Sequence, residues 1–374
     1  MKILLTGAKG FIGKNLTYFL KEAGHEVLCY DLGDESKLEE YVSSSDFIIN
    51  LAGVNRPLTK QEFYDGNLNF SARLLDTVAK VNSKSPIILS SSTKASEDSD
   101  YGKSKKMAED LFFQFAKENN HPVYVFRLYN VFGKWCRPNY NSVIATWCYN
   151  ITHNLPLEIN QDAPAIDFVY IDDVAADFIS IINEDKKGSD SILYPHRFYC
   201  MKLEEIASLL ESFKESRKNH MVPDISTNFA KDLYSTYLSY LDEDNFTYSL
   251  DTHKDYRGSF TEVLKTFDEG QISVNVSKPG ITKGNHYHHT KNEKFLVVSG
   301  TCVTKLRKID SDKIISIKTS GDKLEVIDIP PGYTHCITNV GKSNSVTLMW
   351  ANELYDKSKP DTFFLKVEND EQKI

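Results

Sequence analysis

Long apolar runs are missing from this chain of 374 residues. No stretch approaches the roughly 20 consecutive apolar residues that a membrane-spanning helix needs. The apolar start at residues 3–5 gives way to Thr6 and Gly7, which is too soon for the apolar region of a signal peptide. We therefore expect a cytoplasmic protein without a membrane partner.

Glycine and proline are also scarce, with 18 and 12 residues, which excludes collagen-like and low-complexity disordered structure. Hydrophobic residues make up 41% of the chain and charged residues 26%, as in ordinary globular proteins. At roughly 100–200 residues per domain, the length predicts two or three domains.

Positive charge is in deficit, because 44 Lys and Arg face 52 Asp and Glu, which gives a net charge of −8. That sign argues against a general nucleic-acid binder and against a protein that binds anionic membranes. An anionic small substrate must therefore be held by individual donors.

The six cysteines form no C-x-x-C pair, and a chain of this size without a signal peptide has no need of disulfides, so we expect reduced thiols. The histidines are more informative. Four of the ten, His286, His288, His289 and His335, lie between residues 286 and 335. This clustering predicts a metal site in the last third of the chain.

The first third alternates short apolar runs with amphipathic stretches. We expect a helix over 11–22 and strands over 3–6, 26–31, 47–51, 87–91 and 123–128. Strands that alternate with helices favour β-α-β units, a parallel sheet and therefore a Rossmann-like α/β fold. From Lys202 to about Tyr240 the apolar spacing is helical.

Near Asp242 the pattern changes. Beyond it the segments are short, rich in Val, Ile, Thr and Phe, and separated by Gly and Pro, which is typical of an all-β sandwich or barrel. We therefore expect an α/β domain over 1–242 and an all-β domain over 243–374.

The segment Thr6–Gly13 follows a predicted strand and opens a predicted helix, as a dinucleotide-binding loop requires. Gly7, Gly10 and Gly13 allow a tight turn and a close approach to a pyrophosphate. The free N–H groups at the helix start can stabilise its charge. The segment predicts a dinucleotide cofactor.

Tyr101 and Lys105 have the spacing Y-x-x-x-K and follow a serine run, Ser90–Ser92. Residues four apart share a helix face, so the lysine cation can lower the pKa of the phenol toward neutrality. Such a tyrosine can exchange a proton with a carbonyl or alcohol oxygen while a nicotinamide exchanges hydride. An isolated pair is more often a solvated helix pair, but the upstream glycine loop favours the catalytic interpretation.

Together these segments resemble the extended short-chain dehydrogenase/reductase family. Leu51-Ala52-Gly53 resembles its cofactor-side loop, and residues 127–133 and 167–175 resemble its substrate-side motifs. The resemblance implies that Tyr101 is the acid, that Lys105 activates it and contacts the ribose, and that Ser92 orients the carbonyl. Ser91 and Thr93 remain alternatives to Ser92. The implied ligand contacts are Asn130 for the substrate and, for the cofactor, Gly7, Lys9, Gly10, Phe11, Ile12, Gly13, Asp31, Leu51, Ala52, Gly53, Tyr101 and Lys105.

The cofactor preference depends on two residues. Asp31, at the end of the second predicted strand, suits a ribose 2′-OH and would repel a 2′-phosphate, which favours NADH; it could equally be a turn residue. Lys9 could pair with that phosphate. We expect NADPH, with NADH as the alternative.

The last third resembles the cupin family in two segments with fixed spacing, G-x5-H-x-H-x4-E-x6-G from Gly280 to Gly300 and P-x-G-x2-H-x3-N from Pro330 to Asn339. Leu324 stands where the pattern has a further glycine. On a strand, residues two apart point to one side, so both histidines of the first segment can enter a barrel.

The candidate ligands are His286, His288, Glu293 and His335. This donor set suits Zn, Fe, Mn, Ni or Cu, and we expect one divalent ion, with zinc favoured. The alternative is a metal-free barrel whose histidines pack or perform acid/base work.

Residues 255–262 resemble the Arg-Gly segment of metal-free cupin epimerases that act on dTDP-4-keto-6-deoxy sugars, which implies that Arg257 binds a nucleotide sugar. Those enzymes also carry a Gly-x-His-Tyr motif with a histidine base, similar to residues 284–287.

The two resemblances compete for His286, because a metal-bound imidazole cannot accept a proton. Ligation is favoured, since His288, Glu293 and His335 are otherwise unexplained. The residue that acts as the base is not assigned, and Tyr287, His289 and Tyr333 are the candidates.

A reductase fused to an epimerase-like cupin resembles a family of bifunctional enzymes of capsular polysaccharide synthesis over essentially the whole chain. The resemblance implies that the cupin epimerises C3 of a UDP-2-acetamido-2,6-dideoxy-4-ketohexose. The reductase would then reduce the C4 ketone to UDP-2-acetamido-2,6-dideoxy-L-talose, a precursor of UDP-N-acetyl-L-fucosamine. We expect a UDP-sugar substrate and a homodimer. The alternatives are a redox-neutral C4 epimerase with recycling NAD and a non-catalytic sugar-nucleotide sensor.

Overall fold

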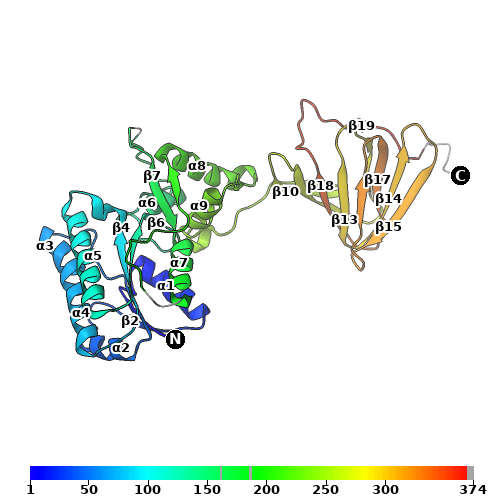
Figure 1. Cartoon of the computed structure of the whole chain (residues 1–374). Helices are drawn as coiled ribbons and strands as arrows, with labels where there is room; N and C mark the ends of the chain where they lie inside the picture. Colours follow the sequence, from blue (N-terminus) through cyan, green and yellow to red (C-terminus); the bar gives the residue numbers. More distant parts are fainter. Residues whose placement is uncertain (161, 185–187, 369–374) are drawn as a thin grey trace. The chain divides into compact units, whose positions relative to one another are not determined.

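The computed structural model describes residues 1–160, 162–184 and 188–368, and the chain divides into two compact units (Figure 1). Unit 1 comprises Met1–Glu211 and Ile225–Glu243, and unit 2 comprises Ser212–Asp224 and the chain from Asp244 onward. The chain thus passes between the units three times. The change of sequence pattern at Asp242 falls beside the last of these passages.

Unit 1 contains a parallel sheet with the strand order β2-β1-β3-β4-β5. Its strands are β1 (Lys2–Thr6), β2 (Glu26–Tyr30), β3 (Phe47–Asn50), β4 (Ile87–Ser92) and β5 (Val123–Leu128). The strands expected from the sequence are therefore confirmed, with ends that differ by at most one residue. They are apolar along their length because both faces of the sheet are buried.

Helices cover both faces of this sheet. The α-helices are α1 (Phe11–Glu22), α2 (Leu38–Ser44), α3 (Lys60–Phe63), α4 (Phe70–Lys80), α5 (Asp100–Asn119), α6 (Val143–Thr152), α7 (Ile171–Asn183), α8 (Leu203–Asn219) and α9 (Asn228–Leu238). Short 3-10 turns span Glu35–Lys37, Thr93–Ser96 and Glu243–Asn245, and a π-helical turn spans Tyr64–Asn69.

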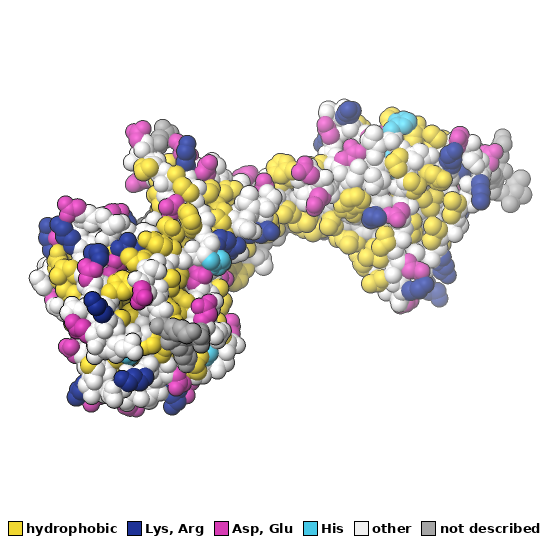
Figure 2. Space-filling view, in the orientation of Figure 1, with side chains coloured by type: hydrophobic (Ala, Val, Ile, Leu, Met, Phe, Trp, Pro, Cys, Tyr) yellow, Lys and Arg dark blue, Asp and Glu magenta, His cyan; other side chains and the backbone are white. Residues whose placement is uncertain are grey.

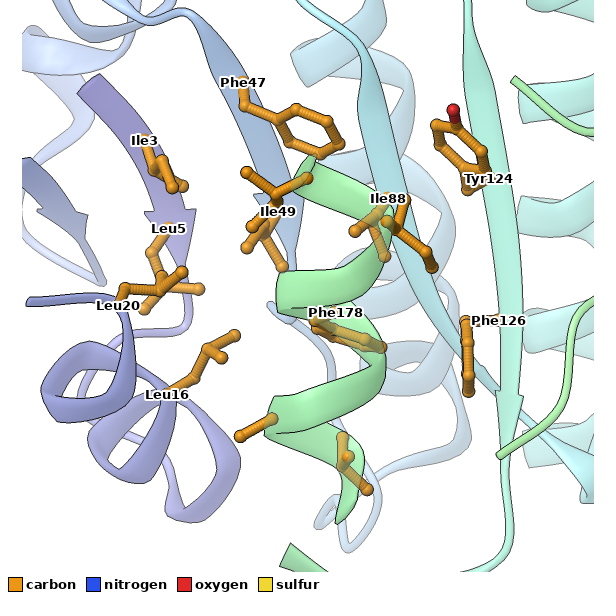
Figure 3. Packing of buried hydrophobic residues seen from close by; sticks show 14 of the residues in the cluster. Ile3, Leu5, Leu16, Leu20, Phe47, Ile49, Ile88, Tyr124, Phe126 and Phe178 are labelled. Atoms are coloured by element: carbon orange, nitrogen blue, oxygen red, sulfur yellow. The ribbon is translucent and has the colours of Figure 1, made fainter. Parts of the chain in front are cut away.

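Two apolar clusters hold the helices on the sheet. On one face, Leu16 of α1 and Phe178 of α7 pack against Ile3 and Ile49 (Figure 3). On the other face, Leu74 of α4 and Phe112 of α5 pack with strand residues that include Leu4 and Ile48. Because the strands are parallel, their carboxyl ends meet at one edge, where open α/β sheets bind their ligands.

A smaller sheet, which the sequence did not predict, follows the main one. Its strands are β6 (Asn130–Phe132), β7 (Ile166–Tyr170) and β8 (Tyr199–Met201), with β6 and β7 parallel and β7 and β8 antiparallel. The helical stretch expected over 202–240 is two helices, α8 and α9, with residues 220–227 between them.

Unit 2 consists of antiparallel sheets, one ordered β16-β13-β18-β11-β10-β9 and the other β15-β14-β17-β12-β19. The strands are β9 (Thr252–Asp255), β10 (Gly258–Lys265), β11 (Gln271–Ser277), β12 (Thr282–Tyr287), β13 (Glu293–Ser299), β14 (Thr301–Lys308), β15 (Ile314–Ser320), β16 (Val326–Ile329), β17 (Tyr333–Asn339), β18 (Ser345–Ala351) and β19 (Phe363–Phe364). Phe295, Leu306 and Ile337 belong to the apolar core between the sheets. The expected combination of a Rossmann-like part and an all-β, cupin-like part is confirmed.

The segment 212–224 joins this β unit through its backbone. The N–H of Val222 donates to the carbonyl of Lys265 (2.7 Å), and the N–H of Lys265 donates to the carbonyl of His220 (2.9 Å). Residues 220–222 therefore extend the sheet beside β10.

On the face shown in Figure 2, Lys and Arg side chains are interspersed with Asp and Glu side chains on each unit. Within the described part of the chain, no helix combines the length and apolarity that a membrane span requires.

Candidate active sites

A cavity of about 580 Å³ lies at the carboxyl ends of the parallel strands in unit 1. Its wall includes most of the residues predicted for the cofactor and for catalysis. They are Gly7, Lys9, Gly10, Phe11, Ile12, Gly13, Leu51, Gly53, Ser92, Tyr101, Lys105 and Asn130. The volume is of the size that small-molecule and cofactor sites have.

The glycine loop is packed so closely that side chains are excluded from it. Gly7 has φ +67°, and a Cβ there would lie 3.0 Å from the amide nitrogen of Ala52. A Cβ on Gly13 would lie 2.2 Å from the carbonyl oxygen of Gly7, well inside contact distance. No described side chain caps the start of α1 at Gly10. The loop therefore fits a pyrophosphate, which can approach the backbone and accept from the free N–H groups of the helix start.

Asp31 and Ala52 support this loop from outside the cavity wall. The Asp31 carboxylate accepts the N–H of Lys9 (2.8 Å) and the N–H of Leu32 (2.9 Å). The N–H of Ala52 donates to the Thr6 hydroxyl (3.2 Å), which itself donates to Asn50 (2.6 Å). Asp31 thus holds the glycine loop in place.

Tyr101 lies in the first turn of α5, which the hydroxyl of Ser99 caps by accepting the N–H of Gly102 (3.0 Å). The Tyr101 ring packs against the ring of Phe63 at a centroid distance of 5.6 Å, and the Ser92 hydroxyl lies near enough to the phenol to favour its ionised form. Burial raises the pKa of Tyr101, and the neighbouring Ser92 hydroxyl offsets part of that rise. The predicted tyrosine and serine are thus neighbours in the wall of the cavity.

Lys105 lies one helical turn further along α5 and is buried. Its Nζ donates to the carbonyl of Ser90 (3.3 Å), and burial lowers the pKa of Lys105 to about 8. The expected lowering of the Tyr101 pKa by this lysine is not observed, because burial of the phenol outweighs the interactions that favour its ionised form. Gly53 makes room for the lysine, since a Cβ there would lie 3.1 Å from Nζ.

A fully buried carboxylate, Glu109, lies behind the Tyr101 and Lys105 pair on the same helix. It accepts from the Ser91 hydroxyl (2.6 Å) and from Nε and Nη2 of Arg127 (2.8 and 2.7 Å). This ion pair raises the pKa of Arg127. The Ser91 hydroxyl therefore serves Glu109 and leaves Ser92 at the phenol, while the Thr93 hydroxyl donates to the carbonyl of Leu128 (3.4 Å).

Sequence reasoning missed Glu109, although its position gave a signal. It lies four residues after Lys105 and eight after Tyr101, so all three share one face of α5. A carboxylate on a buried helix face needs a cationic partner, and Arg127 in the adjacent strand provides it.

The opposite wall of the cavity comes from the segment after β5. It includes Asn130, whose Nδ2 donates to the carbonyl of Asp167 (3.0 Å), and Arg137, whose guanidinium lies 5.4 Å from the ring centroid of Tyr140. Trp135, in the left-handed region at φ +69°, also contributes. Of these, the sequence predicted Asn130 alone as a substrate contact.

A second candidate site lies in unit 2, where His286, His288, Glu293 and His335 bring one ligand atom each within 4.8 Å of one another. His286 lies on β12 and pairs with His335 on β17, while Glu293 begins β13. A β-bulge between Gly284 and His286 places Asn285 at φ +63°. The two sheets thus supply the four side chains predicted from the cupin-like spacing.

The atoms at the centre of this cluster fit a metal ion. Among the described residues, Nε2 of His288, Nε2 of His335 and Oε2 of Glu293 are buried without a hydrogen-bond partner. The Glu293 oxygen is 3.5 Å from the first nitrogen and 3.1 Å from the second, but these contacts lack hydrogen-bond geometry. Unsatisfied buried polar atoms cost free energy, and a cation at this position would satisfy all three.

The charge states of His286 and Glu293 also suit metal binding. Burial, together with the neighbouring His335, lowers the pKa of His286 to about 4, so its imidazole is neutral at pH 7. Burial opposes ionisation of Glu293, but His288 and His335 outweigh it and hold its pKa below the usual range. A neutral imidazole and an ionised carboxylate are the forms that bind divalent ions.

The other candidates of unit 2 lie around this cluster. The rings of Tyr287 and His289 contact each other and Phe363, with centroid distances of 4.8–5.4 Å. Tyr333 packs against the apolar core. Arg257 is paired with Asp255, to which its Nε donates at 2.9 Å and its Nη2 at 2.6 Å.

Comparisons with known proteins cover the whole chain. The NAD dependent epimerase/dehydratase family matches residues 3–194, and the polysaccharide biosynthesis C-terminal domain matches residues 253–363. The chain is 43% identical over 370 residues to UDP-2-acetamido-2,6-beta-L-arabino-hexul-4-ose reductase of Pseudomonas aeruginosa, which covers 98% of this chain and 99% of that protein.

Comparison with solved structures gives the same relationship as comparison of sequences. The crystal structure of the capsular polysaccharide assembling protein CapF from Staphylococcus aureus has a TM-score of 0.92 and 47% identity, covering 98% of this chain and 100% of that one. UDP-glucuronic acid 4-epimerase from Bacillus cereus in complex with NAD has a TM-score of 0.54 and 19% identity, covering 64% and 96%, and so supports the fold of unit 1 alone. The chain belongs to the family of CapF and the hexulose reductase, in which an NAD dependent epimerase/dehydratase unit is followed by the polysaccharide biosynthesis C-terminal domain.

Proposed function

We propose that the protein is a bifunctional UDP-sugar enzyme. Unit 2 epimerises C3 of a UDP-2-acetamido-2,6-dideoxy-4-ketohexose, and unit 1 reduces the C4 ketone with NAD(P)H to UDP-2-acetamido-2,6-dideoxy-L-talose. The observation that carries the proposal is the full-length relationship to the hexulose reductase together with the Tyr101–Ser92 contact in the cavity. The product would serve as a precursor of UDP-N-acetyl-L-fucosamine for capsule or O-antigen.

In unit 1, Tyr101 donates a proton to the C4 oxygen as the ketone becomes an alcohol, and Ser92 orients that oxygen through the hydroxyl that meets the phenol. The nicotinamide supplies the hydride when bound. Its pyrophosphate would be held by the loop from Gly7 to Gly13, and Lys105 would contact the ribose. Asn130 contacts the sugar from the opposite wall.

The proposed cofactor is NADPH, with NADH as the second candidate. Asp31 would repel a 2′-phosphate if it faced the ribose, but both its oxygens accept hydrogen bonds from the backbone of residues 9 and 32. Rates measured with each cofactor at the same concentration decide between the two.

In unit 2, the ligands of a divalent ion, zinc by preference, would be His286, His288, Glu293 and His335. Such an ion supplies Lewis acidity toward the oxygen of the enolate that forms when the C3 proton is removed. Arg257 would bind the nucleotide part of the substrate, for which it must exchange Asp255 for a phosphate. Tyr287, His289 and Tyr333 stay candidates for the base.

The test is to incubate the UDP-4-keto sugar with the protein in deuterated water, with and without NADPH, and to identify the products by NMR. The proposal predicts deuterium at C3 without cofactor and the 6-deoxytalose product with it. Turnover without net consumption of NADPH would instead indicate a redox-neutral C4 epimerase, and absence of turnover would indicate a binding protein.

Because nucleotide sugars and NADPH are cytoplasmic metabolites, we place the enzyme in the cytoplasm. We also propose a homodimer, which light scattering of the purified chain tests directly.

A further inference from the structure

The last described part of the chain wraps around the His/Glu cluster. We call residues 352–368 the C-terminal strap; it follows β18, contains β19 and runs along one end of unit 2 (Figure 1). It is anchored at its start by Asn352, which exchanges hydrogen bonds with Asn292 (2.9 and 3.2 Å). At its far end Arg307 donates to the carbonyls of Val367 (2.8 Å) and Lys366 (2.9 Å).

Within the strap, Asp361 holds the turn that connects two of the cluster residues, His288 and Glu293. Its carboxylate accepts the N–H groups of His289 (3.0 Å), Thr290 (2.9 Å) and Lys291 (2.8 Å), and also the Thr290 hydroxyl (3.1 Å). Successive backbone N–H groups directed at one carboxylate fix the course of a turn.

The backbone of the same residue contacts the cluster itself. Nδ1 of His288 lies 2.5 Å from the carbonyl oxygen of Asp361. A carbonyl oxygen can only accept, so Nδ1 carries a proton, and in the neutral imidazole Nε2, which faces Glu293 and His335, keeps its lone pair. A hydrogen bond of this kind sets the tautomer and the ring orientation of a metal-binding histidine.

From these contacts we infer that Asp361 is a positioning residue for the metal site: its carboxylate fixes the turn 289–291, and its carbonyl presents Nε2 of His288 to the ion. The inference rests on the proposed metal site and deepens it. The strap reaches the site from about seventy residues away in sequence, so the site is complete only when the C-terminal segment has folded over it.

Asp361 lies in the left-handed region at φ +38°, which glycine and asparagine adopt readily. Asp361→Gly therefore deletes the carboxylate without straining the backbone, and Asp361→Asn keeps the shape of the side chain but loses its charge. Asp356→Asn is the matched control, because Asp356 accepts from the N–H (2.8 Å) and hydroxyl (2.7 Å) of Ser358 inside the strap itself.

The experiment measures the affinity of the full-length, chelator-stripped protein for Zn²⁺ by competition with a chromogenic chelator. Loss of an outer contact to a ligating histidine typically weakens metal binding about 10–100-fold. Asp361→Gly keeps the carbonyl that contacts His288 but releases the turn 289–291, so we expect a loss near the lower end of that range, about 10-fold. We expect a smaller loss for Asp361→Asn and unchanged affinity for Asp356→Asn. Unchanged affinity in both Asp361 variants would overturn the inference, whereas a wild-type protein without Zn²⁺ affinity would overturn the metal site itself.

A double-variant cycle separates positioning from a general loss of stability. If Asp361 acts through His288, Asp361→Gly has little further effect on Zn²⁺ affinity in a His288→Ala background. An equal loss in both backgrounds would show that the carboxylate acts on the fold of unit 2 as a whole and would refute positioning. If Asp361→Gly does not fold, Asp361→Asn is used in the same cycle.

Discussion

The two candidate sites differ in how their polar groups are satisfied. In unit 1, Lys105 bonds a carbonyl and Glu109 has three donors. In unit 2, the described cluster keeps three buried polar atoms without a hydrogen bond. The unit 1 site is thus organised by the chain alone, whereas in unit 2 the proposed ion would balance the buried groups. This contrast predicts that the two activities respond to different perturbations.

The largest expected effect separates the two reactions. Tyr101→Phe removes the proposed proton donor and should slow NADPH-dependent reduction by about 10²–10⁴-fold. Solvent-deuterium exchange at C3, followed by NMR, should keep its wild-type rate, because it takes place in unit 2. Parallel loss of both rates would contradict two independent sites.

His288→Ala makes the reciprocal test. One of four ligands is lost, so the metal content found by elemental analysis should fall severalfold and C3 exchange should fall with it. Reduction of a substrate that has already been epimerised should persist. His289→Ala is the control for metal content alone, because its ring contacts Tyr287 and Phe363 and it is also a candidate base for the exchange. Equal metal content in wild type and His288→Ala would refute the ligand assignment.

A smaller effect distinguishes neighbouring serines. Ser92→Ala removes the hydroxyl at the phenol and should lower kcat for reduction with little change in melting temperature. Ser91→Ala removes one of three donors to the buried Glu109 and should reduce the free energy of unfolding by about 1–3 kcal/mol, with a smaller change in kcat. The reverse pattern would assign the orienting role to Ser91.

The last test concerns pH. In the folded protein the pKa of Lys105 is lowered from 10.5 to about 8, so the folded state binds this proton less tightly than the unfolded state does. The stability that Lys105 allows is therefore greatest above pH 10.5, where the lysine is neutral in both states. As the pH falls from 10.5 to about 8, the free energy of unfolding decreases by up to about 1.4 kcal/mol per pH unit. Chemical unfolding of wild type and Lys105→Met between pH 8 and 10 should show the wild type gaining relative stability as the pH rises. A constant difference would show that Lys105 keeps its ordinary pKa.

Local patterns accounted for most of what the sequence predicted. The five parallel strands followed from apolar runs such as 47–50, and the glycine loop and the Tyr101–Lys105 spacing are encoded within single elements. The His/Glu cluster was predictable because His286, His288 and Glu293 lie close together in sequence and His335 lies in a second segment with its own fixed spacing.

Contacts between distant segments could not be predicted in this way. Asp361 meets His288 across about seventy residues, and no local pattern links them. The pKa of Tyr101 depends on how deeply the phenol is buried, which helical spacing does not specify. The small sheet of β6 to β8 likewise depends on pairing between strands too short to show periodicity.

The path of α8 has a consequence for dissecting the protein. Because residues 212–224 belong to unit 2 and bond Lys265, a single cut near residue 243 would leave the β unit without its own segment. Such a truncation would expose the backbone of β10 beside residues 220–222 and invite aggregation. The two units are therefore interleaved along the chain, and an intact unit 2 has to be built as a permuted or co-expressed fragment.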